Sequence, residues 1–140
     1  MIIVDAEGSI AGRLATYVAK QALLGNSVSV VNSEKAVISG RKENTFDKYL
    51  TQVARGTPRK GPFVQKYPHK ILRRVIRGMV PFKKTRGREA YERVLCYIGI
   101  PDEFQGKKMI KVPGADMKKL PTLNYVDLLT LSKRLGAKLE

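Results

Sequence analysis

The N-terminal part of the chain carries a strand–helix–strand pattern that restricts the fold more than any other feature of the sequence. A short apolar run at 2–4 is followed by apolar residues at helical spacing over 10–23 and by a valine-rich run at 28–31. We expect Ser9 to cap this helix and Gly25 to end it in a left-handed turn. Such a βαβ unit has parallel strands joined by a right-handed crossover. The pattern therefore predicts a parallel α/β fold.

Weaker patterns predict further elements within one domain. The chain has 140 residues, of which 43% are hydrophobic, so residues 1–140 are expected to form a single α/β domain with its own core. Residues 107–112 fit either a strand or a loop. The other expected elements are a very short strand at 36–38, a helix at 41–54, a short helix at 87–93, a strand at 94–98 and a last helix that begins near Asp127.

Residues 70–80, KILRRVIRGMV, predict a helix with two different faces. At about 100° per residue, Lys70, Arg73, Arg74 and Arg77 fall on one face and the apolar residues fall on the other. Pro81 ends the pattern, because proline cannot continue the helical hydrogen bonding. One face can therefore pack on a core while the other presents a row of cations.

This helix lies inside a block of positive charge without a negative residue. Twelve Lys and Arg residues, and no Asp or Glu, occur between Arg55 and Arg88, and the net charge of the chain is +15. Such a block indicates a large anionic partner, and we expect 55–88 to be a basic loop–helix–loop insertion that binds RNA. The predicted phosphate-binding residues are Arg55, Arg59, Lys60, Lys66, Lys70, Arg73, Arg74, Arg77, Lys83, Lys84, Arg86 and Arg88.

The segments around the helix favour a folded RNA over a regular duplex. Residues 55–68 contain two glycines and three prolines, so an extended loop is expected that stays disordered until RNA binds. A rigid helix beside irregular loops can follow uneven phosphate paths, and aromatic rings such as that of Phe82 can stack on unpaired bases. The secondary RNA-binding candidates are Arg13, Phe63, Tyr67 and His69.

Catalytic, metal and cofactor sites are not indicated. The turn at 8–13, GSIAGR, departs from both nucleotide-binding glycine motifs, although its helix start could still meet an RNA phosphate. His69 and Cys96 are the only His and Cys, and Cys96 is expected to be inert in the core. We therefore predict a protein that is not an enzyme and has no cofactor and no small-molecule substrate. A nucleotide-dependent enzyme and a DNA-compacting protein remain the alternatives.

Membrane association is not expected either. No apolar run approaches the roughly 20 residues that span a bilayer, and the N-terminus lacks the pattern of a signal peptide. A single cysteine rules out an internal disulfide and favours a cytoplasmic location.

Several motifs resemble one known family. GSIAGRLA near the start, VVNSEKAVISG at 30–40, and RRVIRGMVP with GREAYER within 73–93 are similar to ribosomal protein L13 of the large subunit. RKGPF at 59–63 and GIP at 99–101 resemble its archaeal and eukaryotic branch.

The resemblance carries expectations about fold and function. It implies a three-layer α/β/α fold with a four-stranded, Rossmann-like parallel sheet and basic loop extensions. It also implies a non-enzymatic constituent of the cytoplasmic ribosome that binds large-subunit rRNA beside other ribosomal proteins and supports early subunit assembly. The RGMVP signature falls on residues 77–81, and the RKGP segment on 59–62.

Overall fold

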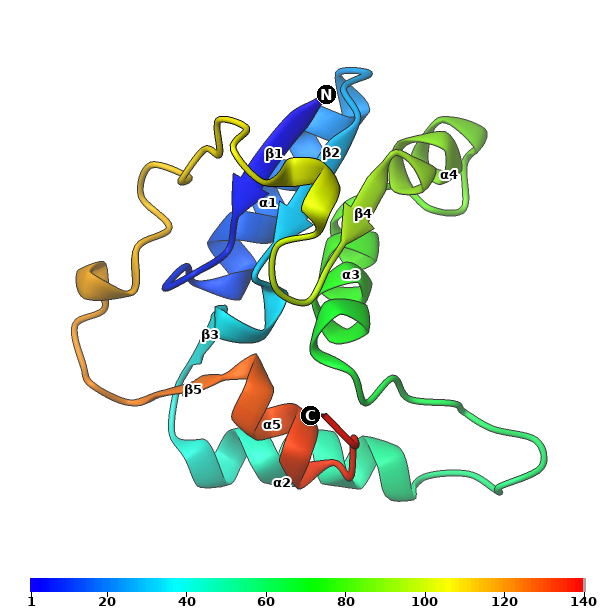
Figure 1. The fold of residues 1–140 in the computed structure, drawn as a ribbon. Coiled ribbons are helices and arrows are strands. Elements are labelled where there is room, and N and C mark those ends of the chain that lie inside the picture. The colour runs from blue at the N-terminus through cyan, green and yellow to red at the C-terminus, as the bar shows by residue number, and fades with distance from the viewer. Residues whose placement is uncertain (140) are drawn as a thin grey trace.

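The computed structural model describes residues 1–139 and shows a parallel sheet packed against helices (Figure 1). The helices are α1 (Ala11–Leu23), α2 (Lys42–Ala54), α3 (Pro68–Met79), α4 (Thr85–Glu92) and α5 (Leu128–Arg134). The strands are β1 (Ile2–Asp5), β2 (Val28–Val31), β3 (Val37–Ser39), β4 (Val94–Cys96) and β5 (Tyr125–Asp127). The predicted mixed α/β class and the elements of the N-terminal βαβ pattern are confirmed.

The main sheet has three parallel strands in the order β1-β2-β4, not four. The short third strand, β3, instead pairs antiparallel with β5. Residues 107–112 form a loop, of which only Ile110 pairs with β1: its N–H donates to the Ile3 carbonyl at 2.9 Å, and its carbonyl accepts from the Asp5 N–H at 3.0 Å.

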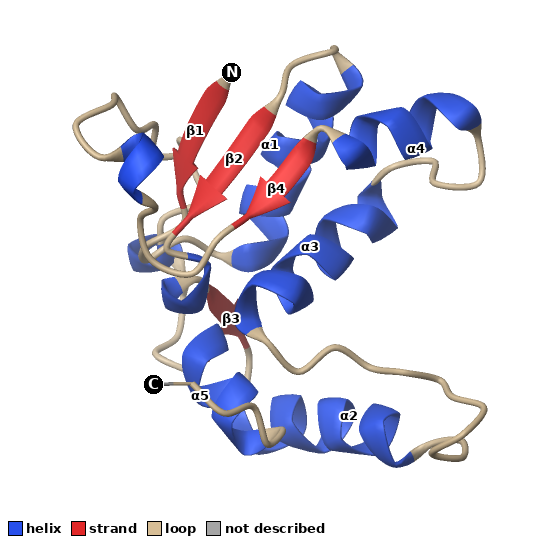
Figure 2. Ribbon diagram, turned by 45° about the vertical axis from the view of Figure 1, so that its right-hand side comes forward, coloured by secondary structure: helices blue, strands red, loops and turns tan. Residues whose placement is uncertain are grey.

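Helices cover one face of this sheet (Figure 2). Leu14 and Val18 of α1 and Leu72 and Ile76 of α3 are fully buried in the cluster that contains the inner side chains of β1, β2 and β4. α4 completes this layer by packing on α1 and contributes the buried Ala90.

The opposite face of the sheet is covered by an irregular segment. Ile3 and Val31 pack there against Phe104 of a single 3₁₀ turn (Asp102–Phe104), with Tyr97 and Met109 beside them. The expected third layer of α-helices is therefore not confirmed for the main sheet. Glycine, proline and lysine are frequent between β4 and β5, and such a segment forms no long amphipathic helix.

The two ends of α1 differ in how well the sequence anticipates them. Gly25 adopts a φ of +97°, and the Asn26 N–H donates to the Gln21 carbonyl at 3.1 Å, as in a left-handed cap. The expected Ser9 cap is wrong, since α1 begins at Ala11 without any side-chain cap. Ser9 is buried and forms a bridge to Asp116 instead, so contacts from a distant segment hold the chain here.

α2 lies beside α5 and away from the main sheet (Figure 1). Its predicted bounds are confirmed to within a residue, but only Thr45 is buried. The apolar side chains Phe46, Tyr49, Leu50 and Val53 are half-buried against the core. α2 therefore leaves an opening toward α3, and residues 55–67 run along that opening.

Candidate nucleic-acid interface

α3 fixes the position of the basic surface. Pro68 occupies its first turn, where the missing N–H of a proline does no harm. Ile71, Leu72 and Ile76 are buried in the core, and Val80 ends the helix. Met79, from the predicted apolar face, stays 41% exposed. The predicted two-faced helix is confirmed, and its apolar face anchors the surface that the cations occupy.

The four cations of α3 have different environments. Lys70 and Arg74 are exposed, whereas Arg73 and Arg77 are half-buried. Nε of Arg73 donates a hydrogen bond to the carbonyl of Val94 in the edge strand β4 at 3.1 Å. The predicted row of four cations therefore divides into an exposed pair and a pair that packs on the protein.

The half-buried pair belongs to an arginine–aromatic stack that joins α3 to α4. The Arg73 guanidinium lies 4.5 Å from the centroid of Tyr91, and that of Arg77 lies 4.1 Å from the centroid of Phe82. The two rings meet edge to face with centroids 5.4 Å apart. Contacts of this kind are individually worth about 0.5–1.5 kcal/mol. Together they fix the angle between the two helices.

Gly87 brings α4 still closer to the end of α3. It is buried, and a Cβ at this position would lie only 2.0 Å from the Pro81 carbonyl oxygen. Gly87 lies inside α4, which begins at Thr85 and not at the expected residue 87. The basic turn of Lys83 and Lys84 is thereby attached to a rigid support.

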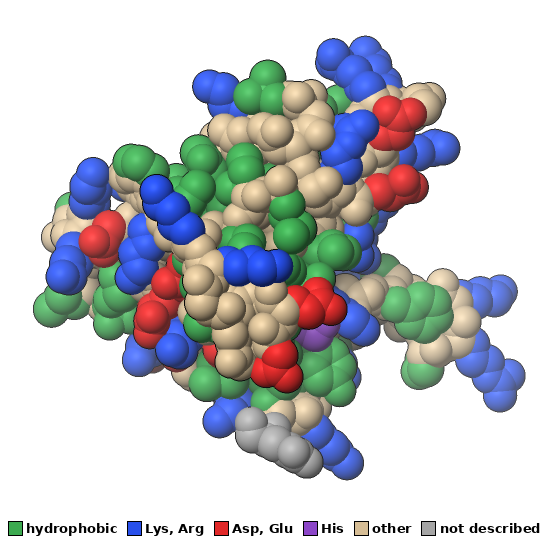
Figure 3. Space-filling view, turned by 45° about the horizontal axis from the view of Figure 1, so that its top comes forward, with side chains coloured by type: hydrophobic (Ala, Val, Ile, Leu, Met, Phe, Trp, Pro, Cys, Tyr) green, Lys and Arg blue, Asp and Glu red, His purple; other side chains and the backbone are tan. Residues whose placement is uncertain are grey.

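The cations of 55–88 have no carboxylate partner within residues 1–139. The ion pairs within residues 1–139 are Lys35–Glu7, Arg93–Glu89 and Lys111–Asp5, and all three lie outside 55–88. All of the predicted phosphate-binding residues except Arg73 and Arg77 are exposed. Figure 3 shows Lys and Arg side chains at the tips of two projections, α4 with its preceding turn and the 55–67 loop. These charges therefore remain available to an external anion.

The positive charge at the start of α4 does not stabilise the folded protein. Lys84 is the N-cap, Arg86 lies in the first turn, and this turn has no acidic residue. The helix dipole makes cations unfavourable at an N-terminus, by about 0.3–1 kcal/mol each when exposed. Their presence there points to a role outside the folding of the protein.

The 55–67 loop ends in a tight turn. Thr57 and Gly61 exchange two backbone hydrogen bonds of 3.1 and 3.0 Å, and Arg59 and Lys60 lie at the tip between them. The segment has no helix or strand, as predicted, although this turn was not expected. Phe63 follows the turn and is 69% exposed, so its ring has little to hold it within the protein.

The other secondary candidates are partly engaged in the fold. Nη1 of Arg13 donates to the Gly114 carbonyl at 3.0 Å. Tyr67 precedes α3, and the Lys70 ammonium lies 5.5 Å from its ring centroid. His69 is half-buried with no hydrogen-bond partner for Nδ1 among the described residues, and burial together with the nearby Lys70 lowers its pKa.

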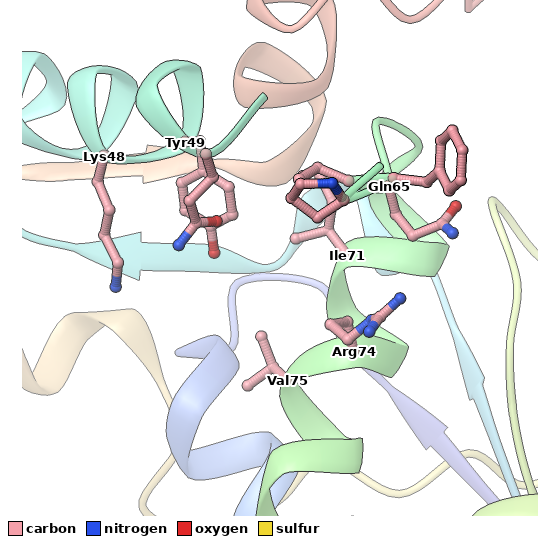
Figure 4. A pocket seen from close by; sticks show the side chains of 10 residues that line it. Lys48, Tyr49, Gln65, Ile71, Arg74 and Val75 are labelled. Atoms are coloured by element: carbon pink, nitrogen blue, oxygen red, sulfur yellow. The ribbon is translucent and has the colours of Figure 1, made fainter. Parts of the chain in front are cut away.

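A hollow between α2 and α3 was not anticipated from the sequence. It has a volume of about 350 Å³, and Figure 4 shows Lys48 and Tyr49 reaching from α2 toward Ile71 and Val75 of α3. Burial raises the pKa of the Tyr49 hydroxyl. The only feature of the sequence that could have indicated this hollow is Tyr49, a tyrosine on the apolar face of α2, because that face is short. The hollow is lined by Lys48, Tyr49, Gln52, Pro62, Phe63, Val64, Gln65, Ile71, Arg74 and Val75.

The turn before α1 is poorly arranged for a nucleotide phosphate. The N–H groups of Gly8, Ser9 and Ile10 donate to protein carbonyls at 3.2, 3.0 and 2.6 Å. Met117 also covers the turn, with its Sδ 3.7 Å from where a Cβ on Gly8 would lie. These backbone donors are thus already used by the protein.

Other reactive features have structural explanations. Cys96 is buried on β4, and burial raises the pKa of its thiol to about 12. Within residues 1–139, no group of three His, Cys, Asp or Glu side chains could hold a metal ion. In the same part of the chain no helix is both long and apolar enough to cross a membrane.

Comparisons with known proteins agree with the motifs. The family model described as ribosomal protein L13 matches residues 1–103. The large ribosomal subunit protein uL13 of Methanococcoides burtonii is 45% identical over 138 residues and 99% of each chain, and that of Methanosarcina barkeri is 43% identical over 139 residues with the same coverage. The protein of the same name from Methanopyrus kandleri is 46% identical over 136 residues, 96% of this chain and 86% of its own. These names are those of ribosomal proteins and not of enzymes, and the chain belongs to the ribosomal protein L13 family.

Proposed function

We propose that this protein is a structural constituent of the large ribosomal subunit that binds large-subunit rRNA through the basic surface of residues 55–88. The observation that carries the proposal is the set of exposed cations in this block that have no carboxylate partner within residues 1–139. Neutralising RNA phosphates is the simplest use for so many unpaired charges.

The form of this surface supports a folded RNA as the partner. The arginine–aromatic stack and Gly87 hold α3 and α4 rigidly, so Arg74, Lys83 and Lys84 keep a fixed spacing. The 55–67 loop carries further cations on an irregular segment. Rigid and adaptable phosphate contacts together suit an RNA whose backbone path is uneven, and we propose that 55–88 acts as an insertion of this kind within a single α/β domain.

Gly78 gives independent support. It lies on the exposed surface of α3, and a Cβ there would meet no atom within 4 Å. Glycine inside a helix is about 1 kcal/mol less favourable than alanine, yet the fold does not require it at this position. A phosphodiester backbone that passes close to α3 would require it, because a methyl group would then occupy the space of the RNA.

The remaining parts of the proposal follow from the family. The protein would act in early assembly of the subunit, contact neighbouring large-subunit ribosomal proteins and reside in the cytoplasm on the ribosome. Binding there would hold rRNA segments in place and involve no reaction, so neither a small-molecule substrate nor a cofactor enters the proposal.

Sedimentation tests the proposal. The tagged full-length protein, expressed in cells that assemble their ribosomes with it, should co-migrate with large subunits and remain bound in high salt. A variant with Lys83→Gln, Lys84→Gln and Arg86→Gln should be depleted from the subunits. It should be at least as stable to heat as the parent, because these three side chains are exposed and Lys84 and Arg86 are unfavourable at the start of α4. Protein that stays at the top of the gradient in every salt would contradict the proposal.

Two control measurements address the alternatives. Calorimetry with mononucleotides and dinucleotides should give no saturable binding near residues 8–13, since the N–H groups of Gly8, Ser9 and Ile10 already donate to protein carbonyls. Competition between random duplex DNA and protein-free large-subunit rRNA should favour the rRNA. Equal affinity for both would favour a DNA-compacting protein.

A further inference from the structure

The hollow between α2 and α3 is not needed for charge neutralisation, and it has a different chemical character from the surface around it. Its walls are apolar where Ile71 and Val75 face α2, and aromatic where Tyr49 reaches across (Figure 4). A solvent-facing gap of this kind is costly for an isolated domain, because it leaves apolar surface in contact with water.

The polar groups that line the hollow are those that a nucleotide would need. Gln52 and Gln65 carry amides that can donate to and accept from the edge of a base. Lys48 and Arg74 contribute cations. Among residues 1–139, no Asp or Glu lines the hollow. The combination of an aromatic ring, side-chain amides and phosphate-binding cations is the one by which proteins hold unpaired bases of RNA.

The size and position of the hollow indicate which ligand it can hold. A volume of about 350 Å³ lies at the small end of ligand pockets, which range over about 300–1,000 Å³, and is sufficient for one base with its sugar. Arg74 belongs both to the hollow and to the exposed cations of α3, so the hollow is continuous with the proposed RNA surface. Its cationic lining suits a phosphate-linked group better than the basic tail of a neighbouring ribosomal protein.

We propose that the hollow between α2 and α3 receives one unstacked base of the bound rRNA. Tyr49 stacks on the base, Phe63 closes over it from the 55–67 loop, and Arg74 and Lys48 bind the adjacent phosphates. Gln52 and Gln65 bind the base edge. This inference rests on the proposed function and adds to it a site that recognises a nucleotide, whereas the surrounding cations only neutralise charge.

Affinity and salt dependence together test the base site. The probe is protein-free large-subunit rRNA, and binding is measured at several salt concentrations for the full-length protein. Tyr49→Leu keeps apolar contacts but removes the stacking ring, and Phe63→Ala alters a side chain that is 69% exposed and cannot unfold the protein. Each variant should bind about ten-fold more weakly. The slope of log affinity against log salt should stay as in the parent, because every cation that binds a phosphate is still present.

A matched control and a second readout make the result specific. Tyr17→Leu changes a half-buried tyrosine of α1 that does not line the hollow, and it should leave the affinity unchanged. Ultraviolet crosslinking followed by mass spectrometry of the digested complex should place a nucleotide adduct on the peptide that contains Tyr49 or Phe63.

The outcomes separate the two proposals. If the parent binds rRNA with a steep salt dependence, but Tyr49→Leu and Phe63→Ala bind equally well and the adducts lie elsewhere, the base site is wrong and the RNA surface stands. If the parent protein itself shows no salt-dependent binding to rRNA, the proposed function and the base site are both overturned.

Discussion

Two glycines of the basic surface have opposite relations to the fold. Gly87 is buried with the Pro81 carbonyl oxygen 2.0 Å from the position of a Cβ, and the contact is with backbone, which cannot rotate away. Gly78 is exposed, with open space around the same position. The first glycine is therefore required by the protein, and the second is explained by an external partner.

Alanine at each position tests this difference. Gly87→Ala should lower the free energy of unfolding by about 1–3 kcal/mol, as overpacked sites do. Gly78→Ala should raise it by up to about 1 kcal/mol and at the same time weaken rRNA binding. Urea unfolding and rRNA titration measure both effects. A Gly87→Ala protein as stable as the parent would show that the turn at Pro81 is free to move.

His69 should make the stability depend on pH. Its pKa lies below the ordinary 6.5, first because burial disfavours the charged ring and second because Lys70 is near. Below pH 6.5 the unfolded chain takes up the proton before the native protein does. The contribution of His69 to the free energy of unfolding should therefore be fully present above pH 6.5. It should be lost as the pH falls through the lowered native pKa.

The chain offers a direct control for this effect. His69 is the sole histidine, so His69→Gln should remove the part of the decrease in unfolding free energy that begins as the pH falls below 6.5. Urea titrations at several pH values in this range give the slope. An unchanged slope in the variant would assign the decrease to other groups.

At the level of elements, the cations of α3 divide into two kinds of residue. Arg73→Ala removes a hydrogen bond to the Val94 carbonyl and a stacking contact with Tyr91, and should lower the free energy of unfolding by about 1–2 kcal/mol. Arg74→Ala should leave stability within about 0.5 kcal/mol and weaken rRNA binding. Equal losses of stability in the two variants would contradict the division.

α3 also shows what local sequence can and cannot predict. The helical spacing of Ile71, Leu72 and Ile76 sufficed to predict the helix and its buried face, because that information lies within one turn or two. The engagement of Arg73 and Arg77 depends on Tyr91 and Phe82, which the fold brings close. For the same reason, the spacing of residues in the sequence could not predict the bridge of Ser9 to Asp116 or the hollow between α2 and α3.

The 55–67 loop is expected to become ordered only with its partner. It has few apolar anchors, and its cations repel one another in the absence of RNA. Amide hydrogen exchange of the isolated protein should be fast over 55–66 and slow in the interior of α3, with protection of the loop appearing when rRNA is added. Strong protection of the loop in the isolated protein would contradict this expectation.

For the molecule as a whole, the parallel sheet supports the helices α3 and α4, which carry part of the basic surface. The N-terminal βαβ pattern was enough to predict β1, α1 and β2, since strong periodicity needs no distant partner. The number of strands and layers could not be obtained in this way: Ile110 contributes a single ladder pair, and Phe104 covers a sheet face from an irregular segment. These features depend on how weakly patterned residues near the C-terminus return to the sheet.

The central claim is that exposed, unpaired cations on a rigid support bind rRNA phosphates. The most direct measurement is the affinity for protein-free large-subunit rRNA as a function of salt, for the parent and for the variant with Lys83→Gln, Lys84→Gln and Arg86→Gln. The slope of log affinity against log salt should become shallower by about 0.7–0.9 for each phosphate that the variant no longer neutralises, while the variant is at least as stable as the parent. An identical slope and affinity in the variant would show that this surface does not contact RNA.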